Sequence, residues 1–362
     1  MIDYLSIATM NIETINKVYS LITKTFQRVP TEKGWNNTEK FYKRGITLYF
    51  TKNKQKEYIK LIIKYSPHKQ YNNNKHNANE FSMKNAQKWI IRTNSSLGIT
   101  ENDFINFYIS QIEIGINFKT SSNPDNVLKK LCMYSKFFFK QSPKYSHYYT
   151  APPESKNRNK YYKIKYYWKS MQKIESINKT NYEMGYCPEN VLRFEIKIER
   201  LNKFKDIKLH KLNDLFANNL NANLKNYILK LHDEVFYFNP KEVITSKLTT
   251  TQKKNYHQWQ VLNYWKIIDV RKRNREKKSY KQLQKKECLH NKISTEILTA
   301  INNIEDKVNN KNIVVFPTEK INLIPIEKQI YCTINKRELH IASTPIYCID
   351  IGIPTIIFQS IK

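Results

Sequence analysis

The sequence lacks the features that mark several classes of protein. Its five cysteines are scattered and form no C-x-x-C pair, which excludes a dense disulfide framework. It contains no glycine-rich G-x-x-x-x-G-K loop, so we expect no intrinsic ATP-driven helicase. No stretch approaches the roughly 18 apolar residues of a membrane helix, and the opening MIDYLSIATMNIE does not resemble a signal peptide. We therefore expect a cytoplasmic protein with no membrane partner.

Acidic residues are scarce relative to basic ones. The 362-residue chain has 62 Lys and Arg against 31 Asp and Glu, a formal net charge of +31. This excess favours a polyanionic partner, because each neutralised phosphate releases counterions from a nucleic acid. The densest run, residues 271–286, carries nine basic residues and one acid, and on a helix it would follow a phosphate backbone. The residues of this run that we expect to contact DNA are Arg271, Lys272, Arg273 and Arg275.

The hydrophobic pattern predicts an α+β fold with a mostly antiparallel sheet and helices on one face. Strands are expected at residues 1–8, 45–51, 58–65, 107–119, 161–169 and 191–199, and helices at 11–26, 81–93, 124–138 and 212–236. Residues 66–80 read as an asparagine-rich loop. Residues 252–310 form a basic helical segment, and the pattern becomes β-like from residue 313. We place a domain boundary near 240, which gives domains 1–240 and 241–362.

Two of the predicted strands carry a carboxylate at the centre of a polar face. In each strand the apolar residues alternate with polar ones. Glu113 therefore lies on the polar face of the first strand, and Glu195, with Arg193 beside it, lies on the polar face of the second. If both strands belong to one sheet, the two carboxylates could converge on a hard divalent cation, Mg²⁺ or Mn²⁺. Two ordinary solvent-facing glutamates are the alternative.

The strand YYKIKYYWK places a tyrosine among lysines. Alternation puts Lys163, Lys165, Tyr167 and Lys169 on one face, with Tyr166 on the other. Nearby ammonium groups favour an ionised phenol and neutralise a phosphate under attack, so Tyr167 is a candidate nucleophile. The adjacent Tyr166 remains an alternative nucleophile. A tyrosine beside lysines can equally be an ordinary surface residue in a chain with 25 tyrosines.

Two histidines lie in the asparagine-rich segment. His76, in KHNAN, is a candidate metal ligand because a neutral imidazole in a polar loop can bind a cation. His68, in SPHK, has the same character. Solvated loop histidines are the alternative for both.

Taken in order, these segments resemble the filamentous-phage replication initiators of the gene-II type, from the first residue to about residue 235. The matching stretches are MIDYLSI at the start, then residues 58–77, 110–118, 160–172 and 190–199, followed by Asp214 to Phe216. The chain departs from the family pattern at Lys75, where glycine usually precedes the H-N pair. It departs again at Gln172, where an acid is usual.

The resemblance implies an enzyme that starts rolling-circle replication of a phage or plasmid by nicking one DNA strand. It implies Tyr167 as the nucleophile that forms a 5′-phosphotyrosine link, with Lys169 beside it. It also implies metal-binding roles for His76, Glu113 and Glu195. From their positive charge, we expect Lys163, Lys165 and Arg193 to contact DNA. Host helicase and polymerase would be further partners. The competing interpretations are a non-catalytic nucleic-acid-binding protein, such as a repressor or RNA binder, and a related relaxase or transposase-type nickase.

Overall fold

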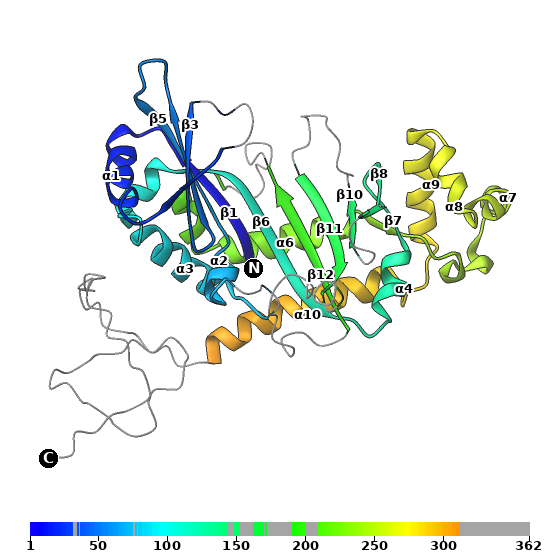
Figure 1. The fold of residues 1–362 in the computed structure, drawn as a ribbon. Helices are drawn as coiled ribbons and strands as arrows, with labels where there is room; N and C mark the ends of the chain where they lie inside the picture. Colours follow the sequence, from blue (N-terminus) through cyan, green and yellow to red (C-terminus); the bar gives the residue numbers. More distant parts are fainter. Residues whose placement is uncertain are drawn as a thin grey trace, which may run out of the picture. The chain divides into compact units, whose positions relative to one another are not determined.

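The computed structural model describes residues 1–31, 35, 37–74, 77, 79–143, 148–151, 162–169, 171, 190–199 and 209–310 (Figure 1). Residues 1–312 group as one compact unit, which extends across the position near 240 where we expected a domain boundary. The β-like segment expected from residue 313 lies outside the described residues.

The fold is built on a ten-stranded sheet in which all the strand pairs among the described residues are antiparallel. In spatial order its strands are β2 (Gln27–Val29), β3 (Thr38–Lys43), β4 (Ile46–Lys52), β5 (Tyr58–Tyr65), β1 (Ile2–Thr9), β6 (Tyr108–Lys119), β12 (Val191–Ile198), β11 (Tyr162–Trp168), β10 (Tyr148–Ala151) and β9 (Lys140–Gln141). A second sheet has the order β13 (Val235–Tyr237), β7 (Leu131–Tyr134) and β8 (Phe137–Phe138). The predicted α+β class with a large antiparallel sheet is therefore confirmed.

The helices begin at residues suited to cap them. The α-helices are α1 (Ile12–Ile22), α2 (Pro67–Tyr71), α3 (Met83–Ser95), α4 (Pro124–Lys129), α6 (Leu220–Asp233), α7 (Thr250–Trp259), α8 (Leu262–Ile267), α9 (Val270–Gln282) and α10 (Leu289–Asn310). Short 3₁₀ helices span Glu101–Asn106, Leu212–Phe216, Pro240–Glu242 and Thr245–Lys247. The Asn11, Ser66 and Ser82 side chains accept a backbone N–H at the starts of α1, α2 and α3, which satisfies donors that have no partner within the helix.

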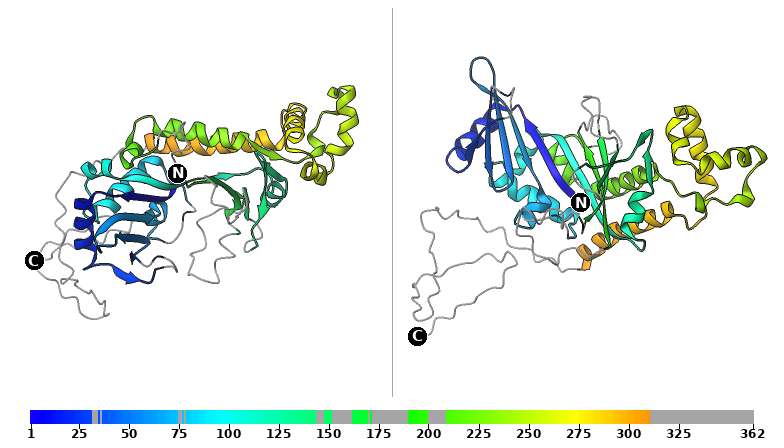
Figure 2. Two further views of the ribbon diagram at one scale, coloured as in Figure 1. Left: turned by 90° about the horizontal axis from the view of Figure 1, so that it is seen from above. Right: turned by 45° about the vertical axis from the view of Figure 1, so that its right-hand side comes forward.

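One face of the central strands is covered by helices, and that face forms the main core. Isoleucines at Ile112, Ile114 and Ile116 of β6 pack in one cluster with Ile293 and Ile297 of α10. Helix α10 contacts both β6 and α6, and the two helices run together along the sheet (Figure 2). The alternation in β6 and β12 turns the polar residues of these strands to the opposite face.

A smaller core holds α7, α8 and α9 to the three-stranded sheet. It joins Trp259 of α7, Trp265 of α8 and Tyr280 of α9 to Met133 and Phe236 of β7 and β13. We call α7, α8 and α9, residues 250–282, the helical module. None of the helices among the described residues combines the length and hydropathy of a membrane-spanning helix.

Two sequence predictions of local structure were wrong. The helix expected over residues 124–138 ends at Lys129, and Leu131–Tyr134 is a strand whose four residues are all buried. The segment 66–80 was expected to be a loop, but Pro67–Tyr71 is a helical turn that begins at the Ser66 cap. The proline that suggested a loop occupies the first turn of this helix, where its missing N–H costs nothing.

Candidate active site

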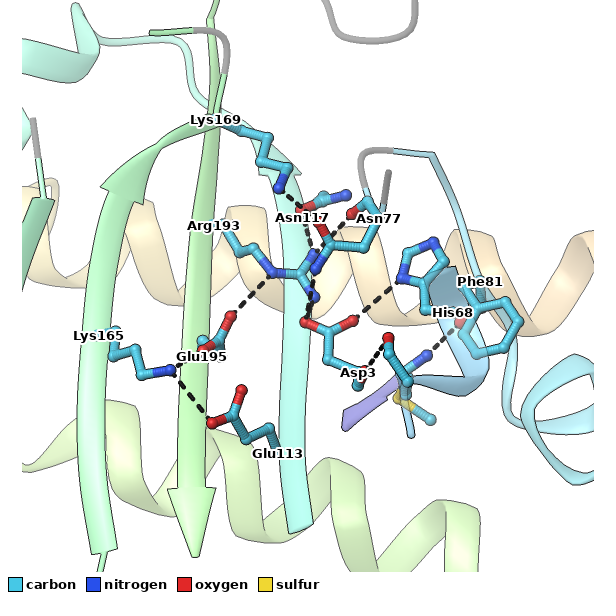
Figure 3. Close-up of polar contacts among 12 residues, drawn as sticks. Asp3, His68, Asn77, Phe81, Glu113, Asn117, Lys165, Lys169, Arg193 and Glu195 are labelled. Atoms are coloured by element: carbon cyan, nitrogen blue, oxygen red, sulfur yellow. Dashed lines mark hydrogen bonds and ion pairs between the residues drawn. The ribbon is translucent and has the colours of Figure 1, made fainter. Parts of the chain in front are cut away.

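Four neighbouring strands bring charged side chains together on the polar face of the sheet (Figure 3). In the antiparallel register Lys165 of β11 lies opposite Glu195 of β12, and Glu195 lies opposite Gly115 of β6. The Lys165 ammonium contacts a Glu195 oxygen and lies 3.4 Å from Glu113 Oε1. The two acids that the sequence paired are therefore neighbours, but a lysine stands between them.

Glu195 is the centre of this group. It is 4% exposed, Tyr167 Oη donates a 3.0 Å hydrogen bond to its Oε2, and Arg193 Nε lies 3.4 Å from the same oxygen. Burial alone would raise the pKa of Glu195, but the charges of Lys165 and Arg193 outweigh burial and lower that pKa to about 2. Glu113 has less compensation, and burial together with the Glu195 charge raises its pKa.

The sequence suggested that nearby ammonium groups favour an ionised phenol at Tyr167. The environment of Tyr167 in the structure has the opposite effect. Burial and, next, the Glu195 charge raise the pKa of Tyr167 well above its ordinary value. The nearby Lys165 is paired with the two glutamates. Lys169 Nζ lies 5.4 Å from the Tyr167 ring centroid and donates to Asn77 Oδ1 at 2.7 Å. The phenol proton is therefore held on Tyr167 and directed at Glu195.

Arg193 crosses β6 to reach β1. Its Nη2 contacts Asp3 Oδ2, and its Nη1 donates to Asn117 Oδ1. The guanidinium passes over Gly115, where an added Cβ would lie 2.7 Å from both Arg193 Cζ and Asp3 Oδ2. Glycine at this position of a strand is therefore needed for close approach. The alternation around Gly115 was visible in the sequence, but the contact of Gly115 with the Arg193 guanidinium was not.

Asp3 connects the sheet to α2. His68 Nδ1 lies 3.0 Å from Asp3 Oδ1, and His68 Nε2 lies 2.8 Å from Asn79 Oδ1. The His68 ring stacks on Phe81 with 4.4 Å between centroids. Burial, and then the nearby N-terminal ammonium, lower the pKa of His68 to about 3, so the ring is neutral at pH 7. Sequence reasoning did not single out Asp3, the one charged residue of β1.

Tyr166 lies on the other face of the sheet. It is fully buried in the main core, and its Oη lies 2.6 Å from His232 Nδ1 of α6. Because α6 and its neighbours cover this face, the placement gives no support to Tyr166 as a nucleophile. The opposite placement of the two adjacent tyrosines follows from strand alternation.

The acids do not fit a divalent cation in their observed arrangement. The Lys165 ammonium occupies the position between Glu113 and Glu195, and both Glu195 oxygens already contact protein donors. Among the described residues, no three His, Cys, Asp or Glu side chains are placed to hold a metal. The third predicted ligand, His76, lies outside the described residues.

The predicted DNA-contacting residues separate into buried and exposed groups. Lys165 and Arg193 are ion-paired within the sheet, and Arg273 is 7% exposed, so these three cations are turned toward protein partners. Lys163 is partly buried on the polar face. The exposed residues are Arg271, Lys272 and Arg275.

Comparison with protein-family models and with curated proteins finds no match for this chain. The resemblance to replication initiators therefore rests on the sequence motifs alone.

Proposed function

We propose that this protein is a rolling-circle replication initiator that nicks and rejoins one DNA strand through Tyr167. The observation that carries the proposal is the geometry of one side chain: the Tyr167 hydroxyl donates to a buried carboxylate, Glu195, on a polar face that also holds Lys165, Lys169 and Arg193. A phenol, a proton acceptor and several cations are the groups that a phosphoryl transfer to tyrosine requires.

In the proposed step, Tyr167 Oη attacks the phosphorus of the scissile phosphodiester and forms a new O–P bond. The phenol proton passes to Glu195 Oε2. The P–O3′ bond breaks, and the 3′ oxygen leaves with the bonding electrons and takes a proton from solvent. The products are a 5′-phosphotyrosine link and a free 3′-hydroxyl, so the phosphodiester energy is kept for the later rejoining reaction.

The phosphate itself would make Glu195 a better base. In the structure, the charges of Lys165 and Arg193 hold the pKa of Glu195 at about 2, which makes it a poor proton acceptor. A phosphate that enters this face competes for the same cations, and its negative charge raises the pKa of Glu195. Proton transfer is then coupled to the arrival of the substrate.

The phosphate needs access to a covered phenol. Tyr167 is 3% exposed, and the Tyr148 ring of β10 stacks on it with 5.3 Å between centroids. In the proposal, the bound strand displaces the Tyr148 ring and takes its place against Tyr167. An unpaired base can replace a stacked tyrosine at low cost, because it stacks in the same way.

A nicking assay tests the proposal. The substrate is a supercoiled plasmid that carries the gene with its flanking DNA, incubated with and without Mg²⁺, and the readouts are the open circle and DNA covalently attached to protein. We expect Tyr167→Phe to abolish both products and Tyr166→Phe, the matched control on the covered face, to retain them. Covalent attachment by Tyr167→Phe would contradict the assignment, whereas DNA binding without any nicking supports the non-catalytic binder.

The remaining parts of the proposal come from the sequence. Mg²⁺ or Mn²⁺ is the proposed cofactor, although the observed acid arrangement provides no site for it, and no step above depends on it. The proposed location is the cytoplasm of a bacterial host, where a host helicase and polymerase would extend the free 3′-hydroxyl. A relaxase or transposase-type nickase would share the same chemistry, and the dependence of nicking on a replication origin separates it from an initiator.

A further inference from the structure

The helix α9 presents two faces of different chemistry. Its inward face, with Arg273, Glu276 and Tyr280, packs into the smaller core. The residues of its outward face follow the helical spacing i, i+4, i+7 and i+11. The exposed residues of the outward face are Arg271, Asn274, Arg275, Lys278 and Gln282.

The single acid of α9 is withdrawn from the outward face. Glu276 Oε2 accepts hydrogen bonds from Trp259 Nε1 at 2.8 Å and from Tyr264 Oη at 2.7 Å. Both donors belong to the helical module, so packing of α7 and α8 against α9 turns the carboxylate inward. No negative side chain of α9 therefore opposes a polyanion at its outward face.

Several cationic side chains of α9 donate hydrogen bonds to backbone carbonyls of neighbouring segments. Arg273 Nη2 donates to the carbonyls of Lys266 and Ile268 at 3.0 and 2.9 Å, where it stabilises the end of α8. Lys277 donates to the Ser135 carbonyl at 3.0 Å, and Lys281 to the Asp233 carbonyl. Within the described part of the chain, by contrast, the side chains of Arg271, Arg275 and Lys278 form no hydrogen bond or ion pair.

The side chains left outward are those that read base pairs. Arg and Lys bind the O6 and N7 atoms of guanine, and Asn and Gln bind the N6 and N7 atoms of adenine, all in the major groove. A stretch of 12 residues from Arg271 to Gln282 rises about 16 Å along a helix, which matches roughly five base-pair steps.

We propose that α9 is a recognition helix that reads a specific duplex sequence in the major groove. The inference rests on the proposed function only in taking DNA as the partner. The exposed lysines Lys253 and Lys254 of α7 belong to the same helical module and would contact flanking phosphates. The reading surface belongs to the helical module, and the polar face with Tyr167 belongs to the large sheet (Figure 1). Site recognition and strand cleavage would thus be assigned to different surfaces.

Selection from a random 24-base-pair duplex library tests this inference. The full chain binds the library in EDTA, so that neither a metal nor nicking contributes, and Tyr167→Phe is selected in parallel. We expect both proteins to enrich the same sequence. Arg275→Ala should weaken binding to the selected duplex about tenfold or more, whereas Asn274→Ala should relax the preference at one position without changing the salt dependence.

The matched control is Lys286→Ala, which removes one exposed positive charge outside α9. We expect it to change affinity for the selected duplex less than threefold. Failure to enrich any sequence would overturn the inference, as would equal binding by Arg275→Ala and the wild type or a preference for a single-stranded pool. Enrichment without nicking in the plasmid assay would refute the proposed function and leave the recognition helix standing.

Discussion

Lowering the pH from 7 to 5 should destabilise the fold through His232. This residue of α6 is fully buried, and its Nδ1 lies 2.6 Å from Tyr166 Oη. Its ring stacks in parallel on His290 with 5.1 Å between centroids. Burial, and then the charge of His290, lower the pKa of His232 from 6.5 to about 3. At a pH between these two pKa values, the imidazole of His232 binds a proton in the unfolded chain but not in the folded chain.

The sign and size of the effect follow from linkage. Because the unfolded state binds more protons in this range, stability rises with pH, is complete above about pH 6.5, and is lost as the pH falls toward 3. From pH 7 to 5 the unfolded imidazole goes from mostly neutral to almost fully protonated, and the integral is about 2 kcal/mol. That is a sizeable fraction of the stability of a typical domain.

Urea denaturation at pH 7 and pH 5 measures this difference. His232→Gln cannot be protonated, so its loss of unfolding free energy between the two pH values should be about 2 kcal/mol smaller than that of the wild type. His257→Gln removes an exposed histidine of α7 and should behave as the wild type does. Equal losses in His232→Gln and the wild type would show that the buried ring is protonated in the folded state.

Three other substitutions test the packing of the polar groups. Arg193→Met leaves Asp3 and Glu195 buried without their shared cation and should cost about 3–5 kcal/mol in urea unfolding; Asp3→Asn in the same chain should recover part of the loss. Gly115→Ala should displace the Arg193 guanidinium and cost about 1–3 kcal/mol, and a variant as stable as the wild type would show that the close approach is unnecessary. Glu276→Ala leaves the Trp259 indole N–H unpaired and should cost about 1–3 kcal/mol, with a shift in tryptophan fluorescence; an unchanged spectrum would argue against the contact.

The strands that form the site were predictable because their period is simple. The alternation in β6, β11 and β12 fixed which side chains share a face, and Glu113, Glu195 and Tyr167 do lie on one face. Residues 131–134 were misjudged because four consecutive buried residues show no period that separates a strand from a helix. Pairing with β13 and β8, which the local sequence does not reveal, makes this segment a strand.

The charge pairing of the site was not predictable from local sequence. Whether Lys165 faces DNA or a carboxylate depends on the register between β11 and β12, which places it opposite Glu195, 30 positions along the chain. Asp3 and Arg193 meet only because β1 and β12 flank the same strand and Gly115 leaves room between them. The inward turn of Glu276 likewise depends on Trp259 of α7, and that of Arg273 depends on backbone carbonyls at the end of α8.

The neighbouring tyrosines of β11 make this strand intolerant of a shift by one residue. Such a slip would carry Tyr166 to the polar face and the Tyr167 hydroxyl into the hydrocarbon of the core, and it would place Lys165 there as well. A slip by two residues would keep each side chain on its face but would place Lys163 or Tyr167, instead of Lys165, opposite Glu195. Length changes before this strand in related proteins should therefore be absorbed by the connection that precedes it, while the spacing from Lys165 to Lys169 stays constant.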